Sequence, residues 1–501
     1  MAIRPPNGAR PTENDRMPQP RSAAGRFVGL SAPALAIAYV VLTAGPVLLA
    51  SFNGGPQGAT VFPLLARTAG VAALAMFLMQ FVTSGRFETI SGRIGLDRTM
   101  GFHRLAAVGA LGMLGLHIVF FLVRAGESGV AAMTRRLLGY LLRADLFTGV
   151  IATLLAVLLI LTGKYLRGRL LPYQGWRLGH GAMAVALVLL GLHHAFTNAR
   201  FMADPLGASA LLVIALVALA SLLVVYVLRP VHAFRSGFTV ASARALSPSI
   251  AELVLTTNTP ERFSFAAGQF AWLTIGRRHT VTDNPFSIAS APSDLPQLRF
   301  LIRNAGDMSG SASNIAPGTR VGVDGPHGSF TLREAGDGPV LLLAGGIGIA
   351  PVLSLVRTLA ATGDPRPVRL IAGARSAADH VVRTEIEDLM AGHDFRAIFL
   401  TDMDDEAGCE KGTCDAGHLA RIVDGLDPAA VTAFICGPPA MMETAVGLLV
   451  EAGVPPGRIV MERFDFDAGD DAVCRMVRRR FISVMALVYG ATFAVALTAA
   501  L

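Results

Sequence analysis

Two apolar segments place histidines fourteen residues apart: HRLAAVGALGMLGLH at residues 103–117 and HGAMAVALVLLGLHH at residues 180–194. In an α-helix, fourteen residues turn through about 1400°, roughly 40° short of four turns, and rise about 21 Å. His103 and His117 therefore share one helix face at two depths, as do His180 and His194. His193 would lie about 140° away from His180, so the helical phase favours His194. A π-bulge would bring His193 round instead.

Both segments belong to a set of long apolar stretches. Apolar residues make up 52% of the 501-residue chain and charged residues only 16%, with a mean hydropathy of +0.53. A spanning helix needs about 20 apolar residues, and six stretches in the first half come near that length, at roughly 27–51, 60–82, 102–123, 145–163, 179–198 and 207–228. A seventh stretch, at roughly 481–501, follows Arg478, Arg479 and Arg480.

The basic residues predict an orientation for these spans. Arginines and lysines gather in the N-terminal tail and in the loops after the second and fourth stretches, so the positive-inside rule puts these in the cytoplasm. Arg124, Arg135, Arg136 and Arg143 lie on the predicted outer side, and we expect residues 135–143 to form an amphipathic helix on that surface. The C-terminus then lies on the extracytoplasmic side, and the chain is expected to be a multi-pass protein of the inner (plasma) membrane.

The four histidines predict two haem sites. Neutral imidazole is a good axial ligand for haem iron, and two imidazoles leave no open position on the metal. His103 would pair with His180 near the cytoplasm, and His117 with His194 near the outer side. Histidines that only pack helices are the alternative, but four of them at two identical spacings favour function, because polar residues are unfavourable in a bilayer. The sequence has no Cys-x-x-Cys-His motif, which argues against covalently attached haem.

Arg67 lies several residues inside the second apolar stretch, toward its outer end. It either faces a haem propionate or an anionic intermediate, or extends to the lipid headgroups.

Residues 231–470 differ in kind from the apolar half of the chain. Alternating β-like runs come first, at 252–256, 270–275, 298–302 and 320–323. Strands then alternate with a helix, at 340–343, 352–360, 369–372 and 433–435. The pattern predicts a small β-barrel followed by a parallel-sheet nucleotide-binding domain.

Three short motifs in the predicted barrel are candidates for flavin binding: NPFSIAS at 284–290, RNAGDMS at 303–309 and GPHGSF at 325–330. They supply hydroxyls, a cation and glycine turns, as a pyrophosphate site requires. The candidate contacts are Asn284, Pro285, Phe286, Ser287, Arg303, Gly306 and Ser309.

The segment VLLLAGGIGIAP at 340–351 is typical of a buried strand, a glycine-rich turn and a helix that opens with Pro351. Its backbone N–H groups and helix N-terminus suit a dinucleotide pyrophosphate, with Gly345, Gly346 and Gly348 at the turn. Cys436, Gly437 and Pro438 end a later strand, at the edge where such sheets bind ligands. Arg375 either contacts a ribose 2′-phosphate or is a solvated loop residue, and Phe464 is placed to stack on the flavin.

Taken together, these residues resemble the superfamily of ferric reductases and NADPH oxidases over roughly residues 27–468, and Trp176-Arg177 before His180 adds to the likeness. The resemblance implies FAD, two haems b and NAD(P)H, with Cys436 near the nicotinamide and flavin. It also implies that Phe464 shields the flavin ring and that Arg67 lies near the outer haem. Two departures are that Asn284 replaces the usual His or Arg, and that the chain continues past Phe464 into another apolar segment.

The expected architecture is a multi-domain membrane protein. It comprises a disordered cytoplasmic tail (1–26), an all-α six-helix transmembrane haem domain (27–230), a β-barrel FAD domain (231–335), an α/β NAD(P)-binding domain (336–468), and a linker with one C-terminal transmembrane helix (469–501).

The resemblance implies transfer of electrons from cytoplasmic NAD(P)H to an acceptor outside, either O2, giving superoxide, or a ferric chelate. A reductase that feeds a quinone or a periplasmic redox protein is an alternative, and so is a non-catalytic haem-binding sensor. A nucleic-acid partner is not expected. The choice between NADH and NADPH stays open, and so does the oligomeric state.

Overall fold

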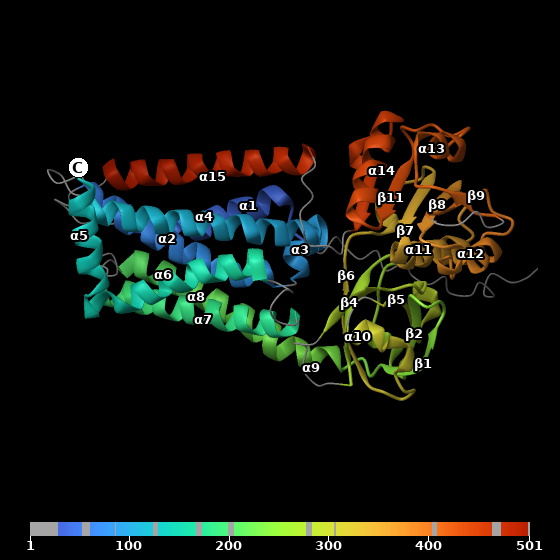
Figure 1. Cartoon of the computed structure of the whole chain (residues 1–501), viewed down its shortest axis with the longest axis horizontal. Coiled ribbons are helices and arrows are strands. Elements are labelled where there is room, and N and C mark those ends of the chain that lie inside the picture. Colours follow the sequence, from blue (N-terminus) through green and yellow to red (C-terminus); the bar gives the residue numbers. More distant parts are fainter. Residues whose placement is uncertain are drawn as a thin grey trace, which may run out of the picture.

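The computed structural model of the chain describes residues 29–52, 61–85, 87–123, 129–166, 173–198, 205–276, 283–304, 307–402, 408–462 and 472–498. A long helical bundle fills one end of the molecule, and two sheet-containing lobes fill the other (Figure 1). The predicted N-terminal tail lies outside the described residues.

Six helices of the bundle are long and apolar enough to cross a membrane, judged by length and composition. They are α1 (Ala32–Phe52), α2 (Val61–Ser84), α4 (Leu96–Leu122), α6 (Phe147–Leu161), α7 (Tyr173–Asn198) and α8 (Pro205–Leu223). Short π-helical segments continue α6 and α8, at Thr162–Leu166 and Val224–Leu228. The most buried of the six is α2, because small residues such as Ala66, Ala69 and Ala72 let its neighbours approach closely. The chain is therefore a multi-pass membrane protein.

Three shorter helices lie at the ends of the bundle: α3 (Glu88–Ile94), α5 (Val130–Leu141) and α9 (Arg229–Ala233). The helix α5 lies across the end farthest from the lobes (Figure 1), close to where an amphipathic helix was predicted. The Arg136 guanidinium donates a hydrogen bond of 2.5 Å to the Leu122 carbonyl, which satisfies one of the last carbonyls of α4.

The last helix, α15 (Ala472–Thr498), runs beside the bundle (Figure 1). It begins nine residues before the predicted stretch 481–501, so the arginine triplet at 478–480 lies inside the helix rather than ahead of it. The Tyr489 hydroxyl donates a 2.7 Å hydrogen bond to Thr43 Oγ1 of α1, and both side chains are buried. That α15 crosses a membrane stays a prediction, because its apolar part is short, Met485–Val495.

The antiparallel lobe is built from two three-stranded sheets. One has the order β1-β2-β5 and the other β4-β3-β6, with strands β1 (Thr239–Ala245), β2 (Ile250–Thr256), β3 (Phe270–Ile275), β4 (Asn284–Ser287), β5 (Gln297–Arg303) and β6 (Val321–His327), and a short helix α10 (Asp307–Gly310). Single bridges, Thr239–Arg320 and Ile288–Phe300, link the two sheets around a core that includes Leu253, Leu273 and Phe300. Closure into a barrel stays a prediction.

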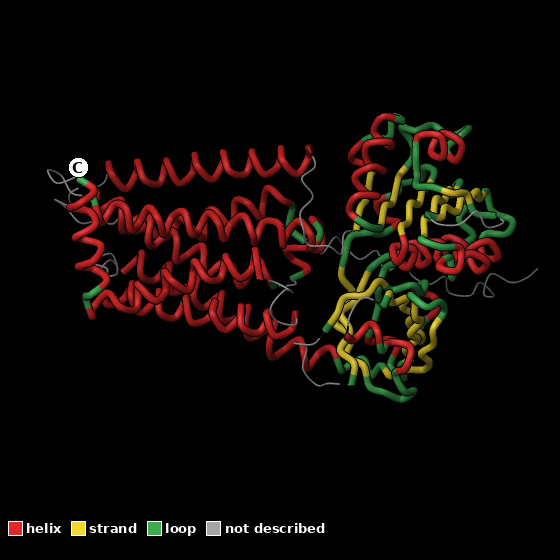
Figure 2. The backbone as a smooth tube through the Cα atoms, in the orientation of Figure 1, coloured by secondary structure: helices red, strands yellow, loops and turns green. Residues whose placement is uncertain are grey.

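The parallel lobe is a six-stranded parallel sheet with helices on both faces (Figure 2). Its strand order is β10-β9-β8-β7-β11-β12, with β7 (Val340–Gly345), β8 (Val368–Ala374), β9 (Phe395–Thr401), β10 (Glu410–Lys411), β11 (Thr432–Cys436) and β12 (Ile459–Glu462). The helices are α11 (Ile349–Thr362), α12 (Arg383–Leu389), α13 (Ala416–Ile422) and α14 (Pro439–Glu451). Burial on both faces explains the unbroken apolar run of β7.

The strand order reverses between β7 and β11. The chain builds outward from β7 to β10 and then returns to place β11 on the other side of β7. In such sheets, ligands bind outside the carboxyl ends of the strands at this switch point. The loops that follow β7 and β11 are therefore where a nucleotide is expected.

Candidate functional site

The structure brings the four predicted histidines together in the two predicted pairs. The imidazoles of His103 on α4 and His180 on α7 lie close enough to interact electrostatically, and so do those of His117 and His194. These are the pairs that helical phase predicts, and their role as ligand pairs stays a prediction.

On α4, both histidines turn Nδ1 toward α2. His117 Nδ1 donates a 2.7 Å hydrogen bond to the Ala66 carbonyl, and His103 Nδ1 lies 3.3 Å from Thr83 Oγ1. A side chain at Gly70 would place its Cβ 2.5 Å from His117 Nδ1, so only glycine leaves room for this ring. Because its Nδ1 donates to a carbonyl, the His117 imidazole has Nε2 available as the ligand atom.

On α7, His194 is seated in the same way against α6. A Cβ at Gly149 would lie 2.7 Å from its Nδ1. The buried Nδ1 atoms of His180 and His194 have no hydrogen-bond partner among the described residues. Trp176 lies against His180, with ring centroids 5.0 Å apart and planes tilted by 34°.

These features fit axial ligation of a porphyrin iron. The glycines at 70 and 149 clear space for two of the rings, and half-buried imidazoles on α4 and α7 supply the ligand pairs. Among the described residues, no three His, Cys, Asp or Glu side chains gather as a site for a bare metal ion. A planar group held from two sides needs only two protein ligands, as each histidine pair offers.

His193 has different surroundings from His194. It is exposed, and its Nδ1 lies 3.3 Å from Thr148 Oγ1. Helix α7 continues as an α-helix to Asn198, without the π-bulge that would exchange the two residues. The local geometry therefore favours His194 as the ligand.

Arg67 lies beside the outer pair. It follows Ala66, which accepts the His117 hydrogen bond, and precedes Gly70 by three residues. Arg67 is half-buried, and its backbone lies within a helical turn of the residues that seat His117.

In the parallel lobe, the glycine turn and the Cys436 loop are in direct contact at the switch point. A Cβ at Gly348 would lie 2.0 Å from the Cys436 carbonyl oxygen, and one at Gly345 would lie 2.7 Å from Pro438 Cδ. A Cβ at Gly437 would in turn lie 3.0 Å from the Gly345 Cα. Small residues on both loops are therefore what lets the carboxyl ends of β7 and β11 meet.

The helix after the glycine turn begins at Ile349. Pro351, which was predicted to open this helix, is buried and is its third residue. A short 3-10 turn, Gly346–Gly348, precedes the helix, and Gly346 has a φ of 53° that suits glycine. The helix N-terminus lies at the switch point, and a helix N-terminus stabilises an anion.

Cys436 is buried, at 1% exposure, at the end of β11. Burial, reinforced by the nearby Glu462 carboxylate, raises the pKa of its thiol well above the usual range. The thiol is therefore a neutral group at physiological pH and not a nucleophile. Phe464, two residues beyond Glu462, lies outside the described residues.

A small cavity opens beside the glycine turn, and it does not include Arg375. It is lined by the ends of β7 and β8 and by the segment before α12, including Gly346, Ala374, Asp379, His380 and Arg383. Arg375 is exposed. The cation that lines this cavity is Arg383, whose guanidinium lies 4.8 Å from the centre of the Phe399 ring.

The predicted flavin motif forms an edge strand. β4 pairs with β3 from Leu273–Asn284 to Phe270–Ser287, with Pro285 and Phe286 between. Ser287 is buried, whereas Arg303 at the end of β5 is exposed. Ser309 is in the short helix α10, and Gly306 lies outside the described residues.

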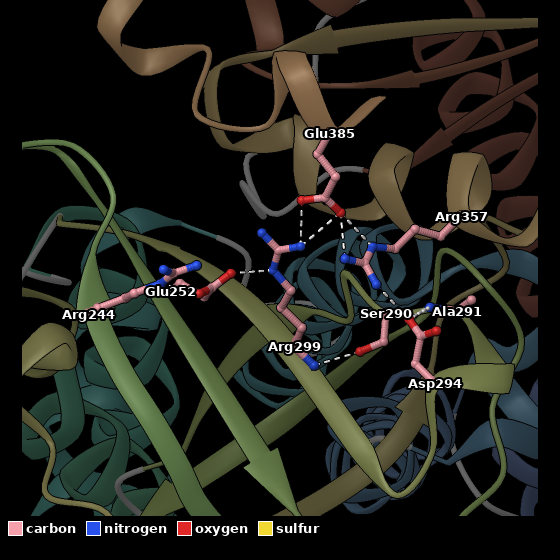
Figure 3. Close-up of polar contacts among 8 residues, drawn as sticks. All are labelled: Arg244, Glu252, Ser290, Ala291, Asp294, Arg299, Arg357 and Glu385. Atoms are coloured by element: carbon pink, nitrogen blue, oxygen red, sulfur yellow. Dashed lines mark hydrogen bonds and ion pairs between the residues drawn. The ribbon is translucent and has the colours of Figure 1, made fainter. Parts of the chain in front are cut away.

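An ion-pair network fastens the two lobes together, and sequence reasoning missed it (Figure 3). The Glu385 carboxylate of α12 accepts hydrogen bonds from Arg299 of β5, at 2.6 and 2.8 Å, and from Arg357 of α11, at 2.8 Å. Arg357 also bonds Asp294 at 2.8 Å, and Arg299 pairs with the buried Glu252. Ser290 accepts a hydrogen bond from the Arg299 backbone N–H, so the network reaches the end of the flavin motif.

The antiparallel lobe also contacts the bundle through charged residues. Arg177 of α7 pairs with Asp283 at 2.7 Å, and Arg229 of α9 lies 3.6 Å from Asp324 of β6. No local pattern in the sequence predicts these partners.

Three family models match the chain in the order of its parts. They are the ferric reductase like transmembrane component over residues 69–191, the oxidoreductase FAD-binding domain over 237–332 and the oxidoreductase NAD-binding domain over 342–447.

Similar proteins include the reductase component of propane 2-monooxygenase from Gordonia sp. (strain TY-5), 35% identical over 239 residues, or 46% of this chain and 68% of the relative. Ferredoxin–NADP reductase B from Sorangium cellulosum (strain So ce56) is 30% identical over 237 residues, covering 45% of this chain and 95% of the relative. A solved Amycolatopsis cytochrome P450 reductase is 26% identical, with a TM-score of 0.40, over 45% of this chain and 68% of that one.

An apolar six-helix bundle joined to an FAD-binding and NAD-binding module of the ferredoxin-reductase type defines a membrane oxidoreductase that takes electrons from NAD(P)H. The match to the ferric reductase like transmembrane component narrows this class of oxidoreductase further. The chain belongs to the superfamily of ferric reductases and NADPH oxidases.

Proposed function

We propose that the chain carries electrons from NAD(P)H through FAD and two membrane haems b to an acceptor on the far side of the membrane, either O2 or a ferric chelate. The observation that supports this most directly is the pairing of four histidines at two depths between α4 and α7. Two ligand pairs along one bundle are what a path across a membrane requires. A single buried histidine would not distinguish a redox path from helix packing.

The proposed cofactors supply the redox chemistry: FAD accepts a hydride and releases electrons singly, and each haem iron exchanges one electron. The protein holds and orients them. His103 and His180 would bind the inner haem, and His117 and His194 the outer one. The cation of Arg67 beside the outer pair favours a propionate or an anionic product there.

In the parallel lobe, the turn at Gly345–Gly348 and the N-terminus of α11 would bind the pyrophosphate of the dinucleotide. Cys436 would then stand at the nicotinamide as a neutral thiol, which excludes water without placing a charge beside the hydride. Asn284–Ser287 and the segment at 303–309 would bind FAD, and Phe464 would cover its ring. Either NADH or NADPH fits this arrangement.

The test uses the purified full-length protein without oxygen. Added NADH or NADPH should bleach the flavin absorbance and then produce the reduced haem α-band, and dithionite gives the fully reduced reference. O2, ferric citrate and a soluble quinone are then offered separately, while superoxide, Fe(II) and quinol are measured. Protein that contains haem reducible by dithionite but never by NAD(P)H would refute the proposal.

A further inference from the structure

One ion pair joins the helix of the proposed haem ligands to the proposed flavin strand. Arg177 Nη1 of α7 lies 2.7 Å from Asp283 Oδ1, and the two residues are 106 positions apart in the chain. The Asp283 side chain is 1% exposed and that of Arg177 is 22% exposed. A carboxylate this deeply buried needs its cation, because an unpaired buried charge is strongly unfavourable.

Each partner adjoins residues that would touch a cofactor. Arg177 precedes His180 by three residues, and the neighbouring Trp176 lies against the His180 ring. Asp283 is followed directly by β4, Asn284–Ser287, which is the edge strand of the sheet β4-β3-β6. The ion pair thus links the base of the inner ligand helix to the residue directly before the flavin motif.

Other contacts hold the same interface. Arg229 lies 3.6 Å from Asp324, and a Cβ at Gly322 would lie 2.8 Å from the Phe234 ring, so the ring packs on the glycine. Without the Arg177 cation, the lobe would therefore stay attached and take a different position. Buried ion pairs contribute little to net stability, and their best-attested use is to fix one arrangement among several.

We propose that Arg177 and Asp283 are positioning residues, which fix the flavin strand against the base of α7 and so set the rate at which electrons pass from the antiparallel lobe to the inner histidine pair. This inference rests on the proposed function and adds a contact that holds the flavin strand near the inner histidine pair. Neither residue touches a reacting atom. Each acts through the element that it holds.

The kinetic test compares Arg177→Gln, Asp283→Asn and the charge swap R177D/D283R with wild type in anaerobic stopped-flow. Flavin reduction by NAD(P)H should keep its rate, because the contacts between the two lobes are unchanged. Reduction of the haem after the flavin should slow by about ten- to a hundredfold in the single variants, since a misplacement of about 1 Å can cost about a hundredfold. The charge swap should recover much of the loss.

Arg244→Gln is the matched control. Arg244 also pairs with a buried carboxylate, Glu252, at 2.6 Å, but wholly within the antiparallel lobe. The Arg244→Gln substitution should leave flavin reduction and the subsequent haem reduction at their wild-type rates. A second measurement needs no cofactor: cysteines introduced as Arg177→Cys and Asp283→Cys should be joined by a short bis-methanethiosulfonate reagent in native membranes, as read by mass spectrometry of the linked peptides.

Unchanged haem reduction in both single variants, or failure of the cysteine pair to cross-link, would overturn the positioning role. Both results leave wild-type electron transfer intact, so they are distinct from failure of the proposed function. That failure would show in wild type, as a haem that NAD(P)H never reduces.

Discussion

Gly348 offers a sharp test of the nucleotide site, because the structure leaves no space for one more methyl group. Its φ of −59° suits any residue, so a substitution tests packing and not backbone strain. A Cβ would lie 2.0 Å from the Cys436 carbonyl oxygen and 2.5 Å from its carbonyl carbon, whereas real Cβ contacts stay above 3.0 Å. Both atoms belong to backbone, so the two loops must separate by about 1 Å, since a packed interior has no room to absorb the overlap.

A displacement of about 1 Å between reacting groups costs about a hundredfold in rate, or about 2.7 kcal/mol in activation free energy. Gly348→Ala should therefore slow flavin reduction by NAD(P)H about a hundredfold. Anaerobic stopped-flow that follows the absorbance of the oxidised flavin measures this step directly. Dithionite does not use the nucleotide site and should reduce the variant as fast as wild type.

Gly447→Ala serves as the control. Gly447 lies within α14, and a Cβ there would meet nothing within 4 Å. The substitution should leave flavin reduction unchanged and stabilise the helix by about 0.5–1 kcal/mol. If Gly348→Ala reduces its flavin as fast as Gly447→Ala does, the two loops do not form the hydride-transfer site and the reasoning is wrong.

The remaining predictions concern haem binding, the fastening of the lobes and pH. His194→Leu should lose one of two haems in a pyridine haemochromogen assay, whereas His193→Leu should keep both; the reverse result would move the ligand to His193. Glu385→Gln should lower the free energy of unfolding by about 1–3 kcal/mol, because its carboxylate bonds two arginines. Glu387→Gln, at an exposed carboxylate on the same helix with the single partner Arg383, should cost about 0.3–0.5 kcal/mol; urea titrations that rank the two equally would contradict this. Burial lowers the pKa of His380, so its contribution to stability is complete above the unfolded value of about pH 6.5 and declines as the pH falls below it. His380→Gln should flatten the loss of stability in that range, and an unaltered pH profile would show that another group is responsible.

Local periodicity predicted much of the fold. The apolar stretches anticipated six helices, and the run at 270–275 has the bounds of β3. The phase of the histidines depends only on helix geometry, so the sequence alone favours His194, and its role as a ligand stays a prediction.

The strand β4 escaped prediction because Asn284-Pro285 is typical of a turn. Proline lacks the N–H that a central strand needs, but it is tolerated at a sheet edge, and β4 is an edge strand. The strand β1, TVASARA, was missed since small and polar residues give it no clear apolar alternation. Both strands are defined by their partners more than by their own residues.

The charged contacts between domains could not be predicted at all. The chain has 43 Lys and Arg residues, and nothing local shows that one of them will meet a carboxylate 106 positions away. The cavity beside the glycine turn makes the same point, because its arginine is Arg383, although Arg375 stands at the position that sequence patterns favour. Pairings of this kind appear only once the chain is folded.

A single helix connects the features that matter most for the proposed path. Arg177, Trp176, His180 and His194 all lie on α7, and a helix of this length is stiff. From Arg177 to His194 it rises about 25 Å, so the contact with the flavin strand and both α7 ligands share one rigid body. A change at Arg177 moves the strand relative to that body without changing the spacing of the two histidine pairs. Positioning variants should therefore slow entry of electrons into the bundle while leaving their passage between the two pairs as it is.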